Sequence, residues 1–324
     1  MEVLKVSGAR IDGICACLPR NAVDNLSECA RVCASEARAR EIVGAVGINR
    51  RRIAADGVSS LDLCVEAAKA LLAGVGAAPD GIGAVVCVTF TPELAMPCNA
   101  CQAQSRLGLQ SGIVAFDVSL ACSGYAYGLY VASLLARETG KKVLLLDGDV
   151  QSAVTRKDDE STVPVLADAG TATLVSADSG NADEWRFAFM SDGAGGEALR
   201  LPVGGTVAMD GFAVFAFVAA KVASFIREFL STSGMTQESF DGFVPHQANV
   251  YMARQLAKSL KFPLEKLCIS GDEVGNSASA TVPVTIAWTN ASGRLLVSGF
   301  GGGLSASVAS IVVPRGAFRK VVEL

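Results

Sequence analysis

The chain has 324 residues, of which 51% are hydrophobic and 19% charged, and its formal net charge is −4. This composition is enough to bury a large core in one or two domains. The weakly acidic balance gives no reason to expect nucleic acid as a partner, because proteins that bind it usually carry a basic surplus. The basic run at residues 49–52 is the exception, and it fits either a solvated face or an anionic partner.

Residues 1–6 alternate apolar and charged types and do not form the apolar centre of a secretory signal. The ten cysteines lie among Ala, Val and Leu, as small core residues do, so we expect a reduced, cytoplasmic protein. Cys98 and Cys101 form a CxxC pair, which is a weak metal signal without a second pair or nearby histidines. No apolar stretch reaches the ~20 residues needed to cross a bilayer, so we expect no membrane insertion.

Hydrophobic periodicity alternates between strand and helix along the chain, which indicates an α/β fold. In the first half we expect strands at 4–15, 84–90, 113–118, 142–147 and 171–176, and helices at 61–72, 100–107 and 123–136. In the second half we expect strands at 185–190, 243–245, 267–269, 294–298 and 305–313, and helices at 212–230, 249–260 and 277–288.

Each half therefore has the order β-α-β-α-β-α-β-β, although the two amino-acid sequences do not visibly match. We divide the chain into residues 1–177 and 178–324. Near-continuous apolar strands require cover on both faces, so we expect two similar sheets packed back to back, in an α-β-α-β-α arrangement.

Cys122 lies just past a predicted strand, in Ala121-Cys122-Ser123-Gly124, where the next helix begins. The thiolate is the reactive form of cysteine, and a helix N-terminus favours it, so we expect a lowered pKa. Taken alone, one cysteine among ten fits the core better than a site.

His246 is the only histidine and follows a predicted strand, in Pro245-His246-Gln247-Ala248-Asn249. Asn276 begins a predicted helix and is by itself a plausible N-cap. Pseudo-symmetry brings the helix starts at Cys122 and Asn276 toward each other, and strand–helix junctions are where open α/β sheets place their sites.

A glycine-rich run, Gly299-Phe300-Gly301-Gly302-Gly303, separates the last two predicted strands. It fits a tight turn, because glycine tolerates positive φ, and it can also present a backbone N–H to an oxyanion. A phosphate-binding role is weak, because the run lacks the Lys-Ser/Thr and the helix of phosphate loops.

Together these strings resemble β-ketoacyl-acyl-carrier-protein synthase III, a condensing enzyme of the thiolase superfamily. The resemblance covers essentially the whole chain and rests on residues 47–54, 116–124, 245–249, 275–277 and 299–303. It implies a thiolase-like fold and an acyltransferase of the 3-oxoacyl-acyl-carrier-protein synthase III type, acting in lipid metabolism and fatty acid biosynthesis. The implied reaction is a decarboxylative Claisen condensation of a Cys-bound acyl group with malonyl-acyl-carrier protein, giving a β-ketoacyl thioester.

The resemblance also implies the residue roles. Cys122 would accept the acyl group, and His246 and Asn276 would donate hydrogen bonds to the malonyl thioester oxygen. The N–H groups of Cys122 and Gly302 would hold the oxyanion of the acyl-enzyme, and Phe300 would exclude water. No metal or redox cofactor is implied; the substrates are acyl thioesters of acyl carrier protein or coenzyme A.

By the same resemblance, the protein is expected to be a homodimer that works with acyl carrier protein. The edge at residues 84–90 and its following loop would lie near the partner. Met96 in that loop would enter the neighbouring subunit's acyl pocket.

The sequence departs from the fatty-acid-initiating members where they hold coenzyme A and carrier protein. Glu41, Ala45 and Glu160 stand where those members place a Trp and two Arg, which argues against tight coenzyme A binding in that manner. Ala216 and Tyr251 stand where basic residues dock the carrier protein.

Arg254, Lys258 and the basic run at 49–52 offer replacement cations. We therefore expect a specialised relative that takes its acyl primer from a carrier protein. Residues 209–211 with Phe215, and residues 249–252, resemble synthase III relatives associated with surface-polysaccharide gene clusters.

Two other functions fit the same fold. One is an acyltransferase that passes the acyl group to an alcohol or amine, and the other is a non-catalytic partner subunit. The presence of Cys122, His246 and Asn276 together favours condensation over both.

Overall fold

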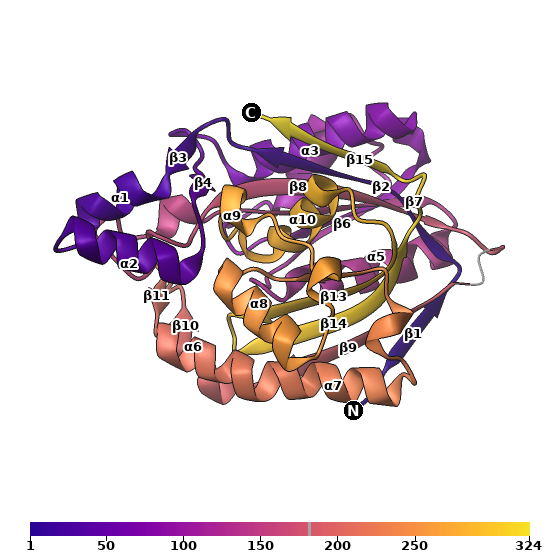
Figure 1. Ribbon diagram of the computed structural model, residues 1–324. Helices are drawn as coiled ribbons and strands as arrows, with labels where there is room; N and C mark the ends of the chain where they lie inside the picture. The colour runs from indigo at the N-terminus through magenta and orange to yellow at the C-terminus, as the bar shows by residue number, and fades with distance from the viewer. Residues whose placement is uncertain (181–182) are drawn as a thin grey trace.

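The computed structural model describes residues 1–180 and 183–324 and contains two large mixed sheets with helices between and outside them (Figure 1). The six-stranded sheet has the order β15 (Phe318–Glu323), β2 (Ala9–Leu18), β8 (Asp168–Ala177), β7 (Lys142–Val150), β5 (Ile82–Val88), β6 (Val114–Val118). The five-stranded sheet has the order β1 (Leu4–Ser7), β9 (Glu184–Ser191), β14 (Ser305–Val313), β13 (Gly293–Gly301), β12 (Gly242–Pro245).

The two sheets repeat one topology. In the first, β2, β8 and β7 pair antiparallel, and β7, β5 and β6 pair parallel. In the second, β9, β14 and β13 pair antiparallel, and β13 and β12 pair parallel. The predicted fold class, an α/β fold with two similar sheets, is confirmed.

The terminal strands cross between the halves. Gly8, with φ 74°, turns the chain, so the strand predicted over residues 4–15 is split into β1 and β2. Strand β1 joins the second sheet beside β9, and β15, which the sequence did not predict, joins the first sheet beside β2. A division of the chain at residue 177 stays a prediction, and these two strands tie its parts together.

Helices occupy three layers. Helices α5 (Gly124–Thr139) and α10 (Thr281–Thr289) lie between the sheets and contact strands of both. Helices α3 (Ser60–Val75) and α4 (Asn99–Arg106) cover the outer face of the first sheet. The outer face of the second is covered by α6 (Gly211–Phe217), a π-helical turn (Val218–Val222), α7 (Ala223–Thr232) and α8 (Val250–Ser259) (Figure 1).

The strands bury both faces, so their hydrophobic residues form separate clusters on either side. In β7, Val143 and Leu145 pack into the central layer, whereas Leu144 and Leu146 pack under α3.

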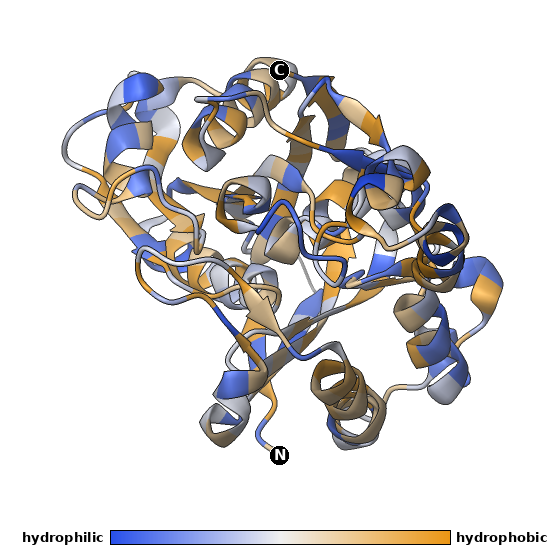
Figure 2. Cartoon of the chain, turned by 90° about the vertical axis from the view of Figure 1, so that its left-hand side faces the viewer, coloured by the Kyte–Doolittle hydropathy of each residue, from blue (hydrophilic) through white to orange (hydrophobic). Residues whose placement is uncertain are grey.

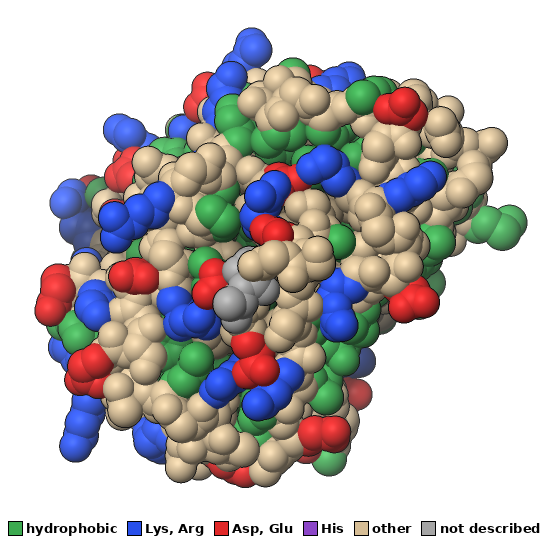
Figure 3. Space-filling model, turned by 90° about the vertical axis from the view of Figure 1, so that its right-hand side faces the viewer, with side chains coloured by type: hydrophobic (Ala, Val, Ile, Leu, Met, Phe, Trp, Pro, Cys, Tyr) green, Lys and Arg blue, Asp and Glu red, His purple; other side chains and the backbone are tan. Residues whose placement is uncertain are grey.

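Figure 2 shows hydrophobic segments along the inner strands and more hydrophilic ones on the outer helices and loops. On the face seen in Figure 3, cations and anions are interspersed, as the small net charge suggests. None of the described helices is long and apolar enough to cross a membrane.

Two sequence expectations about strands are wrong. Residues 267–269 form no strand; a single parallel bridge joins Leu267 to Phe243. The segment expected at a sheet edge, residues 84–90, contains β5, which lies between β7 and β6 with all its residues buried. The edge strand on this side of the sheet is β6, which pairs only with β5 among the described strands.

The sequence did not predict the short strands and helices between β2 and α3. It contains β3 (Ala22–Asp24), α1 (Asn25–Val32), α2 (Glu36–Val46) and β4 (Arg50–Arg52), and the short α9 (Gly271–Val274) packs against β4. Helices α1 and α2 have weak apolar patterns, but each is capped, by Asp24 and by Ser35. A further small ribbon, β10 (Leu199–Arg200) with β11 (Ala208–Met209), precedes α6.

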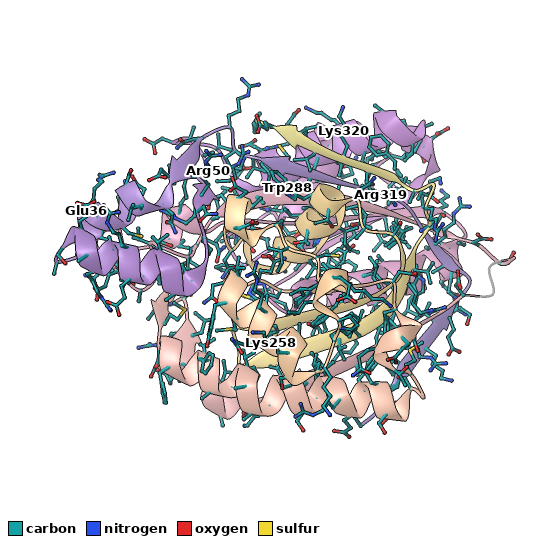
Figure 4. The ribbon with its side chains drawn as sticks, in the orientation of Figure 1. Glu36, Arg50, Lys258, Trp288, Arg319 and Lys320 are labelled. Atoms are coloured by element: carbon teal, nitrogen blue, oxygen red, sulfur yellow. The ribbon has the colours of Figure 1, made fainter. Side chains whose placement is uncertain are left out.

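The basic run at residues 49–52 is neither a free cationic patch nor simply a solvated face. Arg50 pairs with Glu273 at 3.3 Å, and Arg52 pairs with Glu323 at 2.7 Å (Figure 4, where Arg50 is labelled). Arg51 is buried and donates to Asn25 Oδ1 at 2.7 Å and to the carbonyl of Leu166 at 2.9 Å. These side chains link β4 to the second half and to the pocket wall.

The packing of β15 on α3 can be tested at Gly74. A Cβ added there would lie 2.3 Å from Phe318 Cζ, and a Cβ added at Gly13 in β2 would lie 2.9 Å from Phe318 Cβ, so the side chain fits closely between the two glycines. Although alanine favours a helix by about 0.5–1 kcal/mol, we expect Gly74→Ala to lower the free energy of unfolding by about 1–3 kcal/mol. Urea denaturation measures the change.

Gly44→Ala in α2 is the matched control, because nothing lies within 4 Å of its added Cβ. It is expected to stabilise by about 0.5–1 kcal/mol. If Gly74→Ala stabilises as well, β15 does not pack on α3 as described.

Candidate active site

A cavity of about 440 Å³ lies where the two halves meet, and Cys122, His246 and Asn276 all line it. Phe300 and residues 301–303 line it too. The structure thus brings together the three residues that the sequence singled out, with the glycine-rich run beside them. The rest of the wall is mainly apolar and includes Phe90, Leu199, Val207, Met209, Val214 and Met252.

Cys122 lies just before α5, whose N-cap is Ser123, and its side chain is buried. The end of β13 passes so close that a Cβ on Gly299 would lie 2.6 Å from the Cys122 carbonyl oxygen. At Gly301, where φ is 146°, an added Cβ would lie 3.1 Å from Sγ. Only glycine permits this approach, which carries the N–H of Gly302 to the thiol.

The thiol is not activated as the sequence suggested. Burial raises the pKa of Cys122 to about 12, and the hydrogen bond from the Gly302 backbone only partly opposes it. The charge of Asp149 raises the pKa further. Removal of the thiolate from water outweighs the helix N-terminus, so the expected lowering is wrong and Cys122 is a neutral thiol at pH 7.

His246 follows β12 and is only 1% exposed. Its backbone N–H donates to the Ser298 carbonyl at 2.6 Å, and its ring meets Phe300 edge-on, with 5.3 Å between centroids. Burial lowers the pKa of His246 to about 4, while a backbone hydrogen bond of Ala278 acts in the opposite direction. His246 is therefore a neutral imidazole at pH 7, able to donate one hydrogen bond and accept another.

Both backbone groups of Asn276, the N–H and the carbonyl, form hydrogen bonds with the first half of the chain. Its N–H donates to Val165 at 3.0 Å, and its carbonyl accepts from Ala167 at 2.8 Å and from Gln151 Nε2 at 2.5 Å. Its side-chain Oδ1 accepts from the Ala278 N–H at 3.0 Å, so the amide group presents Nδ2 as its donor. The helix expected from residue 277 begins later: a 3₁₀ turn spans Ala278–Ala280, and α10 starts at Thr281.

Two contacts that the sequence did not predict fix the glycine run. Ser305 donates to the Gly302 carbonyl at 2.6 Å and lies 2.7 Å from the hydroxyl of Ser123. These hydroxyls join the start of α5 to the turn that carries Gly302. Scattered serines give no sequence signal for such a link. The part of the wall at residues 199–207 was missed as well, because it has no clear periodicity.

Met96 is not part of this cavity wall. It lies in the loop between β5 and α4 and is 85% exposed. Its role in a neighbouring subunit stays a prediction.

Glu41 and Glu160 stand where nucleotide-binding residues were expected, and both lie beside one cation, Arg38. Arg38 of α2 bonds Glu41 at 3.0 Å and lies 3.8 Å from Glu160. Ala45, Ala216 and Tyr251 are exposed, as a partner surface requires.

The fold and the cavity together define a thiolase-fold enzyme with a cysteine, a histidine and an asparagine at one site. Two family models match the chain: 3-oxoacyl-[acyl-carrier-protein] synthase III over residues 116–193, and its C-terminal model over residues 230–313. A β-ketoacyl-[acyl-carrier-protein] synthase III of Streptomyces coelicolor is 34% identical over 94% of both chains.

Solved structures agree. The 3-oxoacyl-(acyl-carrier protein) synthase of Burkholderia xenovorans superposes with a TM-score of 0.94 at 32% identity, covering 100% of this chain and 99% of the other. The priming β-ketosynthase of the R1128 polyketide pathway gives 0.87 at 26% identity, covering 97% and 98%. The chain belongs to the 3-oxoacyl-acyl-carrier-protein synthase III family.

Because His246 is the only histidine, its titration can be read without ambiguity. We expect its Cε1 proton resonance in tag-free protein to titrate with a midpoint near 4, following the lowered pKa. The fold favours the neutral imidazole of His246. The contribution of this group to the free energy of unfolding is therefore fully present above pH 6.5, and it is lost as the pH falls from 6.5 to 4. The loss amounts to about 3 kcal/mol.

Unfolding of His246→Asn over the same pH range is the control, because this variant lacks that part of the pH dependence. A midpoint near 6.5 in the native protein would show that the imidazole is open to water and that the described burial is wrong.

Proposed function

We propose that the chain catalyses the decarboxylative Claisen condensation of an acyl group on Cys122 with malonyl-acyl-carrier protein. The product is a β-ketoacyl thioester of the carrier protein, with release of CO2. The observation that carries this proposal is one cavity lined by Cys122, His246 and Asn276, in a chain whose length is matched by synthase III relatives.

In the first half-reaction, Cys122 Sγ attacks the carbonyl carbon of an acyl thioester. A new S–C bond forms, the bond to the carrier sulfur breaks, and the thiol proton leaves with the released carrier thiol. The reaction thus begins and ends with neutral thiols, as the raised pKa of Cys122 requires. The Gly302 N–H, which already bonds the sulfur, lies where it can stabilise the tetrahedral oxyanion.

In the second half-reaction, the malonyl thioester loses CO2, and the electron pair of the broken C–C bond becomes an enolate. Asn276 Nδ2 and the neutral imidazole of His246 donate to the enolate oxygen as its charge develops. The enolate carbon then attacks the acyl carbonyl on Cys122, the bond from that carbonyl to the sulfur breaks, and the sulfur takes up one proton from solvent. Phe300, 1% exposed beside His246, keeps water from this site.

The primer donor is a carrier protein rather than free coenzyme A. Arg38 is already engaged by Glu41 and Glu160, so this part of α2 offers acids where a nucleotide phosphate needs cations. The exposed cations Arg254 and Lys258 lie on α8 (Figure 4, where Lys258 is labelled). Met252 of the same helix lines the cavity. The two cations suit the acidic surface of a carrier protein.

The reaction is tested by separating its halves. Native protein is incubated with acetyl-carrier protein or acetyl-coenzyme A, and intact mass reports the acylation of Cys122. Malonyl-carrier protein is then added, and CO2 and product mass are measured. We expect faster labelling from the carrier protein, and a β-ketoacyl product that Cys122→Ala does not make. Asn276→Ala should still be acylated while condensation falls by about 10²–10³-fold.

If native protein acylates Cys122 yet never consumes malonyl thioester, the chain is an acyltransferase to another acceptor. If Cys122 is not acylated by either donor, the chain is a non-catalytic relative. Rapid labelling by acetyl-coenzyme A would overturn the choice of donor alone.

We further propose a homodimer formed through β6. This strand is the edge of the six-stranded sheet, and its first residue, Val114, is 42% exposed. An unpaired edge is a template for a second copy, and pairing there places the loop with Met96 near the partner.

Light scattering is expected to give about twice the chain mass of 33.3 kDa. Val114→Lys should shift the mass toward one chain, because a charge on the edge blocks pairing. Leu264→Lys, an exposed position in the second half, is the control and should remain dimeric. A native protein of single-chain mass, or a dimer untouched by Val114→Lys, contradicts the β6 interface.

A reducing compartment, the cytoplasm, is the proposed location, because all ten cysteines are free and six of them are buried.

A further inference from the structure

Strand β7 carries two carboxyl groups that the reaction above does not use. Asp147 and Asp149 are both fully buried. Alternation along the strand puts them on the same face as Val143 and Leu145, which pack into the central layer. Each has one oxygen, Oδ2, without a hydrogen-bond partner among the described residues.

Asp149 supports one wall of the cavity. Its Oδ1 accepts from the backbone N–H groups of Phe90 at 2.9 Å and Thr91 at 3.0 Å, and from the hydroxyls of Thr89 and Thr91. Phe90 lines the cavity. These bonds account for Asp149 as the anchor of a tight turn.

Asp147 reaches the opposite wall. Its Oδ1 accepts from Ser279 Oγ at 2.6 Å, across the boundary between the halves. Ser279 lies in the 3₁₀ turn Ala278–Ala280, which begins two residues after Asn276. The turn reaches both donors, because the Ala278 N–H fixes Asn276 Oδ1 and the Ala278 backbone lies close enough to His246 to oppose the lowering of its pKa.

This turn needs an anchor. Ala278 has φ 53°, a left-handed conformation that costs a non-glycine residue about 1–2 kcal/mol. Such a conformation persists only where surrounding contacts hold it. Backbone contacts with Val165 and Ala167 hold Asn276 itself, but they end before Ala278. The bond from Ser279 to Asp147 holds the turn on its other side.

Packing alone does not account for a carboxyl group at this position. A buried polar atom without a partner costs about 1–3 kcal/mol, and an apolar side chain would fill the space without that cost. Burial also raises the pKa of Asp147 well above its ordinary value, which favours the protonated form. What the site retains is an oxygen, Oδ1, that accepts from Ser279 Oγ.

We propose that Asp147 is a positioning residue: through Ser279 it holds the turn at Ala278, so that Asn276 and His246 aim their donors at the malonyl thioester. This proposal rests on the condensation proposed above for its chemistry. It assigns Asp147 to the second half-reaction alone, because Cys122 and Gly302 are held by other contacts.

The test compares the half-reactions in Asp147→Ala and Ser279→Ala. We expect acylation of Cys122 within about twofold of native, and malonyl-dependent condensation reduced by about 10–100-fold, since misplacement by about 1 Å can cost 10²-fold. The double variant should be no worse than either single one, because both remove the same link. Asp147→Asn keeps Oδ1 as a neutral acceptor and should restore most of the rate.

Ser133→Ala is the matched control, because it removes another buried serine hydroxyl in the central layer, one that bonds within α5. It should leave both half-reactions unchanged. A second readout needs no substrate: the His246 resonance should titrate at a higher pH in Asp147→Ala and Ser279→Ala as water enters, and as in native protein in Asp147→Asn.

The proposal is overturned if both half-reactions fall together, if Asp147→Asn fails to restore condensation, or if the alanine variants fold and react as native protein does. If native protein consumes no malonyl thioester but His246 responds as described, the link is upheld and the condensing function is what fails. If neither responds, both fail.

Discussion

The structure depends on one close approach, the end of β13 against the segment that carries Cys122. An added Cβ on Gly299 would lie 2.6 Å from the Cys122 carbonyl oxygen and 2.7 Å from Ser123 Cα, so two backbones touch without side chains between them. This contact buries the thiol and brings the Gly302 N–H to it. The hydroxyl pair Ser123–Ser305 locks the same junction. Each half supplies part of the site, and neither part is complete without the contact.

Burial at this junction sets the electrostatics of the site. It raises the pKa of Cys122 and lowers that of His246, so both are neutral at pH 7. Charge appears only during reaction, on a tetrahedral oxyanion and on an enolate oxygen. Neutral donors fixed in advance stabilise such charge strongly, because few waters compete and little reorganisation is needed. A pre-formed thiolate or imidazolium would instead pay the cost of burial throughout the cycle.

The sequence predicted the parts of the site that local strings encode. Cys122, His246 and Asn276 each stand at a predicted strand end or helix start, and the resemblance of the strings that contain them to one family marked them as one site. The pKa of Cys122 could not be predicted, because a helix N-terminus is local, whereas burial comes from the other half of the chain. Residues 267–269 read as a strand, but beyond the bridge at Leu267 the N–H groups of Ser270 and Gly271 donate to Gln247 Oε1 and not to a neighbouring strand.

Hydrogen bonds between residues far apart in the chain are the part of the site that could not be predicted from the sequence. Gln151 reaches the Asn276 carbonyl, and Asp147 reaches Ser279, both from β7 or its end to the opposite half. The two residues of each hydrogen bond are 125 and 132 positions apart in the sequence, so hydrophobic periodicity does not predict them. Apolar packing between the sheets has no strong directional preference, and it alone would allow the halves to shift by a fraction of an ångström. Directional hydrogen bonds remove that freedom. The accuracy of the donor pair at Asn276 and His246 is therefore a property of the interface between the halves.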